Sequence, residues 1–247
     1  MQRFDGWRVV VTGGGTGIGA AVSCRFADEG ATVVVAQRTA EEAIEAVRTL
    51  DAPGRRLIPV GADLATADGC RELAAAAVDQ LGSVDLLVNN ASATGRPAVG
   101  DIDDFDDDRV DLVIDVGIKA PFRLTRLLLP NFAPGAVVVN ISSVAAYTAQ
   151  PRSTVYAAAK AGLVGLTRGL AFELAERGIR VAHVAPGDIA TRGPAVAPEP
   201  GPWGRRTPLG RRGLPADVAA AVAWLASEDA SFVTGSGVLV DGGWLTY

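Results

Sequence analysis

Short apolar runs alternate with longer helical patterns along almost the whole of this sequence. The apolar runs lie at 7–11, 32–36, 57–60, 84–88, 136–141, 179–185 and 237–240. This alternation is typical of parallel strands joined by helical crossovers, which give a doubly wound sheet with helices on both faces. The run at 32–36 is almost entirely Val and Ala, as expected for a strand covered on both faces. The pattern predicts an α/β fold with a seven-stranded parallel sheet.

The size and composition of the chain are compatible with one such domain. Its 247 residues and 49% hydrophobic content are enough for a single α/β core. No internal repeat or linker interrupts the pattern, so we expect one domain over residues 1–247. The one long irregular stretch, 187–212, is rich in Pro, Gly and Arg, and loops of this length in compact domains are usually functional or disordered.

A glycine-rich segment follows the first apolar run. Residues 12–19 read Thr-Gly-Gly-Gly-Thr-Gly-Ile-Gly and lead into a helical pattern that begins near Ile18. Glycines let the main chain approach a pyrophosphate closely, and the unpaired N–H groups of a helix start favour its negative charge. A tight turn is the alternative interpretation, but the strand, turn and helix context favours a dinucleotide site of the Rossmann type.

Three polar side chains further along the chain form a second pattern. Ser143 follows the apolar run 136–141, which places it at the carboxyl end of a predicted strand, where open α/β sheets bind ligands. Tyr156 and Lys160 are four residues apart and therefore share one face of a predicted helix. A nearby ammonium favours the phenolate form of a tyrosine, so we predict that Tyr156 exchanges a proton with a substrate hydroxyl.

Further short motifs complete a recognisable series. They are Asp63-Leu64, Asn89-Asn90-Ala91, Pro186-Gly187 with Thr191, and Asp241-Gly242-Gly243. With the glycine segment and the three polar residues, they resemble the short-chain dehydrogenase/reductase family over nearly the whole chain, and in particular its 3-oxoacyl-carrier-protein reductase type. The resemblance implies a single-domain Rossmann fold with strand order 3-2-1-4-5-6-7.

The resemblance also implies the roles of individual residues. Tyr156 is then the catalytic acid/base, Ser143 positions the substrate oxygen, and Lys160 lowers the pKa of Tyr156 and holds the nicotinamide ribose. The stretch 187–212 is the lid over the substrate. The implied cofactor-binding residues are Gly13, Gly15, Thr16, Gly17, Ile18, Gly19, Arg38, Thr39, Asp63, Leu64, Asn90, Ala91, Tyr156, Lys160, Pro186, Gly187, Ile189 and Thr191.

One position departs from the family pattern. Gly117 stands where relatives usually have an asparagine that helps to hold a water linking the lysine to solvent. A glycine inside a helix costs about 1 kcal/mol relative to alanine and marks a kink or a space. Our hypothesis is that a water fills this space and that activity survives.

The end of the second predicted strand bears on the choice of cofactor. Sheets that bind NAD carry an acid at this place, whereas this chain has Gln37, Arg38 and Thr39. A guanidinium can pair with a 2′-phosphate, and no carboxylate at this place repels it, so NADP(H) is favoured and NAD(H) remains the alternative. Arg38 could instead be a solvent-exposed side chain at a helix start.

The substrate pocket is less constrained by sequence. Its candidate residues are Ser92, Thr94, Arg96, Ala145, Gln150, Arg152, Asp188 and Trp203. Arg96 and Arg152 could attract a carboxylate or a phosphopantetheine-linked substrate, or could be rim side chains in weak ion pairs. His183, the only histidine, lies on a predicted strand, and we expect a packing role.

Composition restricts the possible partners. A net charge of −5 argues against nucleic acid, and no apolar stretch approaches the roughly 20 residues that a membrane helix needs. We expect a cytoplasmic protein in which Cys24 and Cys70 are buried, reduced thiols. The acidic run at 101–108 precedes a predicted helix, whose start favours carboxylates, and we expect no metal there.

These observations predict an NADPH-dependent ketoreductase that transfers hydride between a nicotinamide and a carbonyl or secondary alcohol. An NAD(H)-dependent alcohol dehydrogenase is the alternative within the same class. A cofactor-binding protein with little redox activity, and a dehydratase or epimerase, are alternatives of other classes. Relatives commonly form tetramers, and we expect Ala157, Ala161, Leu163, Gly165, Leu166 and Leu170 to pack across a dimer axis or against the sheet of their own chain.

Overall fold

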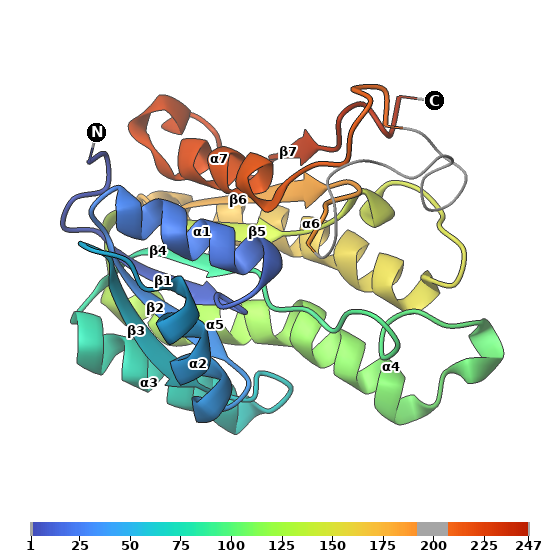
Figure 1. The fold of residues 1–247 in the computed structure, drawn as a ribbon, viewed down its shortest axis with the longest axis horizontal. Helices are drawn as coiled ribbons and strands as arrows, with labels where there is room; N and C mark the ends of the chain where they lie inside the picture. Colours follow the sequence, from blue (N-terminus) through green and yellow to red (C-terminus); the bar gives the residue numbers. More distant parts are fainter. Residues whose placement is uncertain (1, 192–206, 247) are drawn as a thin grey trace.

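The computed structural model describes residues 2–191 and 207–246. Its centre is a seven-stranded parallel sheet with the order β3-β2-β1-β4-β5-β6-β7, so both the predicted sheet and its strand order are confirmed (Figure 1). The strands are β1 (Arg8–Thr12), β2 (Thr32–Gln37), β3 (Arg56–Gly61), β4 (Val84–Asn89), β5 (Phe132–Ile141), β6 (Arg180–Pro186) and β7 (Gly237–Val240). Strand β5 begins earlier than predicted because Phe132 pairs with Val84 before a register shift.

Helices cover both faces of the sheet (Figure 1). They are α1 (Gly17–Asp28), α2 (Ala40–Leu50), α3 (Ala67–Leu81), α4 (Asp107–Ile114), α5 (Ala120–Leu128), α6 (Thr154–Leu174) and α7 (Pro215–Ala226). Helices α1 and α7 bury Val22, Phe26 and Val222 on one face, and α3, α5 and α6 bury Leu73, Leu124 and other side chains on the opposite face. The central strands are therefore mostly apolar, because each residue meets a helix on one side or the other.

Helices α4 and α5 form one continuous helical segment joined by a π-helical turn at Asp115–Lys119. Gly117 lies buried in this turn. The acidic run before it caps helices: Asp101 belongs to a capping box at a short 3-10 turn, and Asp106 accepts a hydrogen bond of 2.9 Å from the backbone N–H of Arg109. Carboxylates stabilise helix starts in this way, as predicted for the run.

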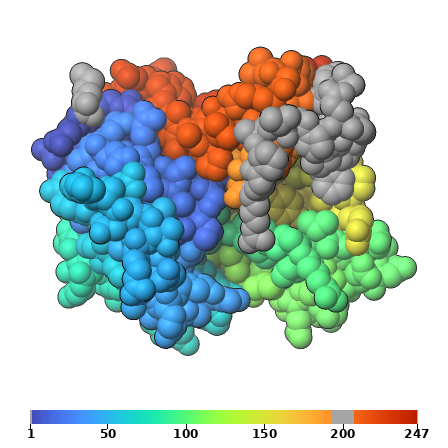
Figure 2. Space-filling view, in the orientation of Figure 1, coloured from blue at the N-terminus to red at the C-terminus, as the bar shows by residue number. Residues whose placement is uncertain are grey.

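All seven strands end at the same edge of the sheet because they run parallel, so the loops that carry the predicted site residues meet there. In the space-filling view the surface is hollowed between the N-terminal part of the chain, in blue, and the later segments in green and orange (Figure 2).

Of the two cysteines, Cys70 is buried and Cys24 only partly so, which corrects the prediction for Cys24. Within the described part of the chain, no helix has both the length and the apolar character needed to span a membrane.

Candidate active site

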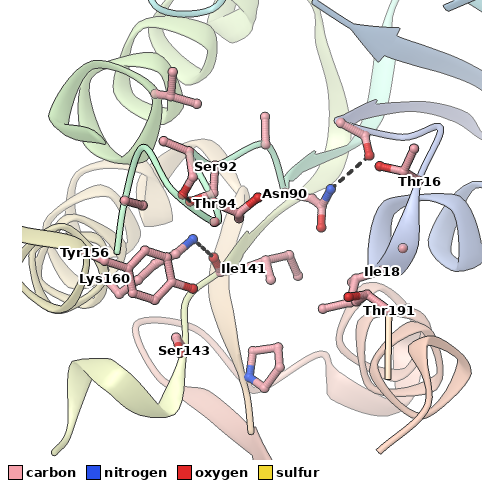
Figure 3. Close-up of a pocket in the computed structure, with 18 of the residues that line it drawn as sticks. Thr16, Ile18, Asn90, Ser92, Thr94, Ile141, Ser143, Tyr156, Lys160 and Thr191 are labelled. Atoms are coloured by element: carbon pink, nitrogen blue, oxygen red, sulfur yellow. Dashed lines mark hydrogen bonds between the residues drawn. The ribbon is translucent and has the colours of Figure 1, made fainter. Parts of the chain in front are cut away.

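A cleft of about 1190 Å³ opens at the carboxyl edge of the sheet. Thr16, Ile18 and Thr191 lie at one end, Ser143, Tyr156 and Lys160 at the other, and Asn90 lies between them (Figure 3). All eighteen residues of the predicted cofactor set except Gly19 and Thr39 line this cleft. The cleft therefore joins the glycine segment and the three polar residues in one continuous space.

The glycine loop after β1 has no room for side chains. Gly13 has φ +61°, a conformation that side chains disfavour, and a Cβ at Gly19 would overlap the carbonyl oxygen of Gly13. The Thr12 hydroxyl accepts hydrogen bonds of 2.9 Å from the backbone N–H groups of both Asn90 and Ala91. The Asn90 amide donates to the carbonyl oxygen of Gly13 at 3.1 Å. These bonds fix the loop to the end of β4.

The start of α1 is open toward the cleft. Thr16 occupies the N-cap position but its side chain makes no capping hydrogen bond, and the first turn contains no acidic residue. Thr191 lies above this turn, with its methyl group 3.2 Å from the position that a Cβ of Gly17 would take. Uncapped N–H groups and the helix dipole fit a pyrophosphate. The cradle therefore fits a dinucleotide.

The loop after β6 forms the neighbouring wall and is held by the C-terminal segment. The Gly187 N–H donates to the carbonyl oxygen of Val240 at 3.0 Å, and a side chain at Gly187 would overlap Asp241. The Asp241 carboxylate accepts hydrogen bonds from the backbone N–H groups of Gly243 and Leu245 at 2.9 and 3.0 Å. The Asp-Gly-Gly motif thus supports this wall from behind.

Helix α6 places Tyr156 and Lys160 on the same side of the cleft, as their spacing predicts. The Lys160 side chain is buried and its Nζ donates to the carbonyl oxygen of Ile141 at 2.8 Å (Figure 3). The same Nζ lies 5.6 Å from the centre of the Tyr156 ring. Ser143 follows β5, and its Oγ accepts a hydrogen bond of 3.1 Å from the backbone N–H of Ala145. The three residues line the same end of the cleft.

Burial is the largest influence on the pKa values of Tyr156 and Lys160. Burial lowers the pKa of Lys160 from 10.5 to about 8. Burial also raises the pKa of Tyr156, which a hydrogen bond with Ser143 partly opposes. The Tyr156 pKa is therefore above its ordinary value, whereas the family resemblance implies a lowered one, because the cost of burying the phenolate outweighs the hydrogen bond with Ser143. The phenol is in its protonated form, ready to donate.

Gly117 brings the π-helical turn close to α6. A Cβ at this position would lie 3.2 Å from the Cβ of Ala159, the residue before Lys160. The side chains of Leu112 and Val116, from the same helical segment, line the cleft. π-Turns within helices are frequent at functional sites. A Cβ at Gly117 would therefore be in tight contact with α6, and the hypothesis that a water lies beside Gly117 remains a prediction.

Two hydrogen-bonded pairs of polar side chains behind the site were not predicted from the sequence. Asn89 and Asn140 lie opposite each other on β4 and β5 and share a hydrogen bond of 2.8 Å. His183 is buried on β6, in agreement with its predicted packing role, and its Nε2 forms a hydrogen bond of 2.6 Å with the Tyr147 hydroxyl. This bond ties the turn after Ser143 to the sheet. In the sequence, the signal for the asparagine pair was that each asparagine lies at the carboxyl end of its strand, so that the two could face each other across the sheet.

The end of the cleft at Gln37 and Arg38, the predicted adenosine end, differs from the sequence prediction in one respect. Arg38 lines the cleft, but its guanidinium forms an ion pair of 3.0 Å with Glu42. Thr39 caps α2 by accepting a hydrogen bond of 3.2 Å from the Glu42 N–H. Arg38 therefore has a counter-charge within the site. Glu42 has no distinguishing pattern around it in the sequence, because acidic residues are common in the first turn of a helix.

The predicted substrate residues separate into groups. Ser92, Thr94, Gln150 and Asp188 line the cleft, and Asp188 is held by Arg212 at 2.8 Å. Ala145 is buried and does not line it, although Val144 beside it does. Trp203 lies outside the described residues, as does 192–206 of the predicted lid.

Arg96 and Arg152 do not line this cleft but a charged depression beside it, which corrects the prediction. Arg152 forms ion pairs of 3.4 and 3.9 Å with Asp101 and Asp104, and its backbone has φ +61°. Both carboxylates come from the loop before α4, so Arg152 links that loop to the start of α6. Its charge is therefore directed away from the reacting groups.

Comparison with known proteins places this geometry in context. Residues 13–245 match the family model described as enoyl-(acyl carrier protein) reductase. The 3-oxoacyl-(acyl-carrier-protein) reductase FabG of Thermotoga maritima is 36% identical over 98% of this chain and 99% of its own length. A blue fluorescent protein from a metagenomic library, solved in complex with NADPH, has 34% identity and a TM-score of 0.87 over 98% of this chain and 99% of its own.

A second solved structure carries the other nicotinamide. It is a 7α-hydroxysteroid dehydrogenase complexed with NADH and 7-oxo glycochenodeoxycholic acid, with 32% identity and a TM-score of 0.88 over 100% of this chain and 97% of its own. Neighbours of comparable similarity therefore carry either NADPH or NADH.

Proposed function

Because this chain belongs to the short-chain dehydrogenase/reductase family and is an NAD(P)-dependent oxidoreductase, we propose that it is an NADPH-dependent ketoreductase. One observation carries the proposal: Ser143, Tyr156 and Lys160 meet at one end of a cleft whose other end is a glycine loop and an open helix start. A proton donor and a dinucleotide cradle in one continuous cleft suit hydride transfer to a carbonyl group.

When bound, the nicotinamide supplies the hydride that adds to the carbonyl carbon. Ser143 donates a hydrogen bond to the carbonyl oxygen and orients it toward Tyr156. The Tyr156 phenol gives its proton to that oxygen, so that a ketone becomes an alcohol and the phenol becomes a phenolate. The Lys160 ammonium stabilises the phenolate through space, and a proton from solvent restores the phenol. Alcohol oxidation uses the same groups in reverse.

The preference for NADPH rests on Arg38. It is the cation that lines the adenosine end of the described cleft, and no carboxylate occupies the strand-end position at Gln37. A guanidinium pairs readily with a 2′-phosphate. A measured preference for NADH of more than about tenfold would overturn this assignment, since tenfold corresponds to about 1.4 kcal/mol.

The proposal is tested by following nicotinamide absorbance with NADPH and with NADH. The substrate panel contains simple ketones, β-ketoacyl thioesters, oxosteroids and quinones, and the control enzyme is Tyr156→Phe. We expect turnover with NADPH and at least one ketone, and loss of that turnover in the variant. Tight NADPH binding without turnover of any member would contradict the ketoreductase and support a cofactor-binding protein, a dehydratase or an epimerase.

We also propose assembly into a homotetramer, in which α6 contributes to a subunit interface. Ala161 and Gly165 are exposed on this helix, and a Cβ at Gly165 would meet no neighbouring atom within 4 Å. Leu163 and Leu170, by contrast, are buried within their own chain. Light scattering that gave only the mass of the 25.4 kDa chain would contradict the assembly.

A further inference from the structure

Helix α2 is fixed tightly beside the glycine loop. A Cβ at Gly15 would overlap the methyl group of Ala46, and a Cβ at Gly61 would overlap the backbone nitrogen of Ala40. These close contacts hold the first turns of α2 against the glycine loop. Glu42 lies one helical turn before Ala46 and on the same side of the helix, which brings its side chain to the cleft wall.

The cap of α2 directs the Glu42 carboxylate toward Arg38. Thr39 binds the N–H of Glu42, so Glu42 is the third residue of the helix. Side chains on a helix lean toward its N-terminus, and Glu42 therefore reaches back to the residue before the cap. The resulting ion pair with Arg38 measures 3.0 Å, with 71% of the arginine side chain and 45% of the glutamate side chain exposed.

Negative charge at this end of the cleft opposes the attraction of Arg38 for a 2′-phosphate. In the described cleft wall the cations are Arg38 and Lys160, and Lys160 is at the opposite end. Glu42 lines the cleft beside Arg38, and Asp63 lines it after β3, the strand that pairs with β2. A 2′-phosphate at Arg38 would meet a guanidinium whose charge is already offset and the Glu42 carboxylate that offsets it.

We propose that Glu42 is a specificity-determining residue that lowers the preference of this protein for NADP(H) over NAD(H) by holding Arg38. The inference rests on the proposed function, since it concerns the same cofactor site. Arg38 must exchange the carboxylate of Glu42 for the phosphate of the ligand when NADP(H) binds. Neutralising Glu42 removes both the competing partner and one repelling charge, while an adenosine ribose without the phosphate is little affected.

The experiment measures direct binding of NADP⁺ and NAD⁺ by calorimetry at low ionic strength, where charge effects are least screened. Glu42→Gln is expected to tighten NADP⁺ binding by about threefold to fivefold, the upper range for an exposed ion pair, and to leave NAD⁺ within about twofold. Arg38→Gln in the same background should remove the gain, because the phosphate then lacks its cation.

Two control variants on the same helix separate this effect from others. Glu45→Gln makes the same change of net charge, but Glu45 pairs with Arg48 on the exposed surface and does not line the cleft. Glu41→Gln also removes an acid from the first turn of α2 and so reproduces any effect on the helix dipole. Both are expected to leave the ratio of the two dissociation constants unchanged, and thermal unfolding checks that each variant folds.

The outcomes distinguish this inference from the proposed function. Nucleotide binding with an unchanged ratio in Glu42→Gln, or with the same change in Glu45→Gln, would overturn the role of Glu42 and leave the oxidoreductase proposal intact. Failure of the wild-type protein to bind either nucleotide would overturn both. A larger NADP⁺ preference in Glu42→Gln alone would support the inference.

Discussion

The two ends of the cleft hold the same kind of charged group under opposite conditions. Lys160 is 3% exposed and interacts with a backbone carbonyl, whereas 71% of the Arg38 side chain is in contact with solvent. Charge interactions are many times stronger in a low-dielectric interior than beside water. The comparison indicates that groups at the buried end control the rate of the reaction and groups at the exposed end control the choice of cofactor. Substitutions at the buried end should therefore have larger effects than substitutions at the exposed end.

The largest effect is expected for Tyr156→Phe. Removing the phenolic hydroxyl removes the proton donor, and general acid catalysis contributes about 10²- to 10⁴-fold to rate. We expect kcat/KM to fall by about this factor while nucleotide affinity changes little. Steady-state rates and nucleotide titrations on the same preparation check both parts.

Tyr147→Phe is the matched control for this prediction. It removes a tyrosine hydroxyl that binds His183 rather than lining the cleft. We expect turnover of wild-type order and a loss of about 1–3 kcal/mol in unfolding free energy, because the His183 Nε2 loses its partner. An equal loss of turnover in both variants would contradict the assignment of Tyr156 as the proton donor.

The next effect tests how strongly burial acts on Lys160. Its folded pKa of about 8 lies below the ordinary 10.5, so between these pH values the unfolded chain binds a proton that the folded chain does not. Wild-type stability from this group should rise with pH across that window, and Lys160→Met should lack the rise. We expect the difference in unfolding free energy between the two proteins to change by roughly 3 kcal/mol from pH 7 to pH 10.

Urea unfolding of wild type and Lys160→Met at both pH values measures this change directly. If the difference in unfolding free energy between the two proteins were the same at both pH values, the lysine would be solvated. The claimed contrast between a buried Lys160 and an exposed Arg38 would then be wrong. Loss of turnover in the same variant is expected but does not by itself test burial.

A smaller effect is expected at Gly117, beside the buried end. The Cβ of Gly117→Asn would lie 3.2 Å from the Cβ of Ala159, so the π-helical turn must shift slightly. We expect a loss of about 1–3 kcal/mol in stability and less than about a tenfold change in turnover. Gly117→Ala adds the same Cβ without the amide. If Asn raised turnover by orders of magnitude and Ala did not, the natural proton relay would be defective.

The smallest effect is expected at the exposed end. Arg38→Ala should lower the ratio of kcat/KM with NADPH to that with NADH by about threefold to tenfold, because the pair with a phosphate is screened by water. Arg48→Ala, an exposed arginine in the last turn of α2, is the control. An effect in Arg38→Ala as large as that of Tyr156→Phe would contradict the comparison.

Much of the fold followed from local pattern. The alternation of apolar runs gave all seven strands to within a few residues, and the spacing of Tyr156 and Lys160 placed both on one helix face. The early start of β5 was missed because Phe132 pairs with Val84 across a bulge, and no residue near it marks a regular strand. Patterns of this kind predict secondary structure, which depends on residues close together in the sequence.

The substrate end was predicted least well, for a physical reason. Arg152 is next to predicted site residues in the sequence, yet its side chain turns to Asp101 and Asp104. Ala145 is two residues from Ser143 but is buried. The direction of a loop side chain depends on which distant segments pack beside it, and sequence spacing carries no record of that.

The sequence alone determined the parallel sheet, the glycine cradle and the order of the catalytic groups, because backbone propensity and side-chain periodicity act over a few residues. Only the tertiary structure decided that Lys160 is buried, that Arg38 already has a partner in Glu42, and that His183 holds Tyr147. Pairing and desolvation depend on distances between segments far apart in the chain, and those distances exist only once the helices have packed on the sheet.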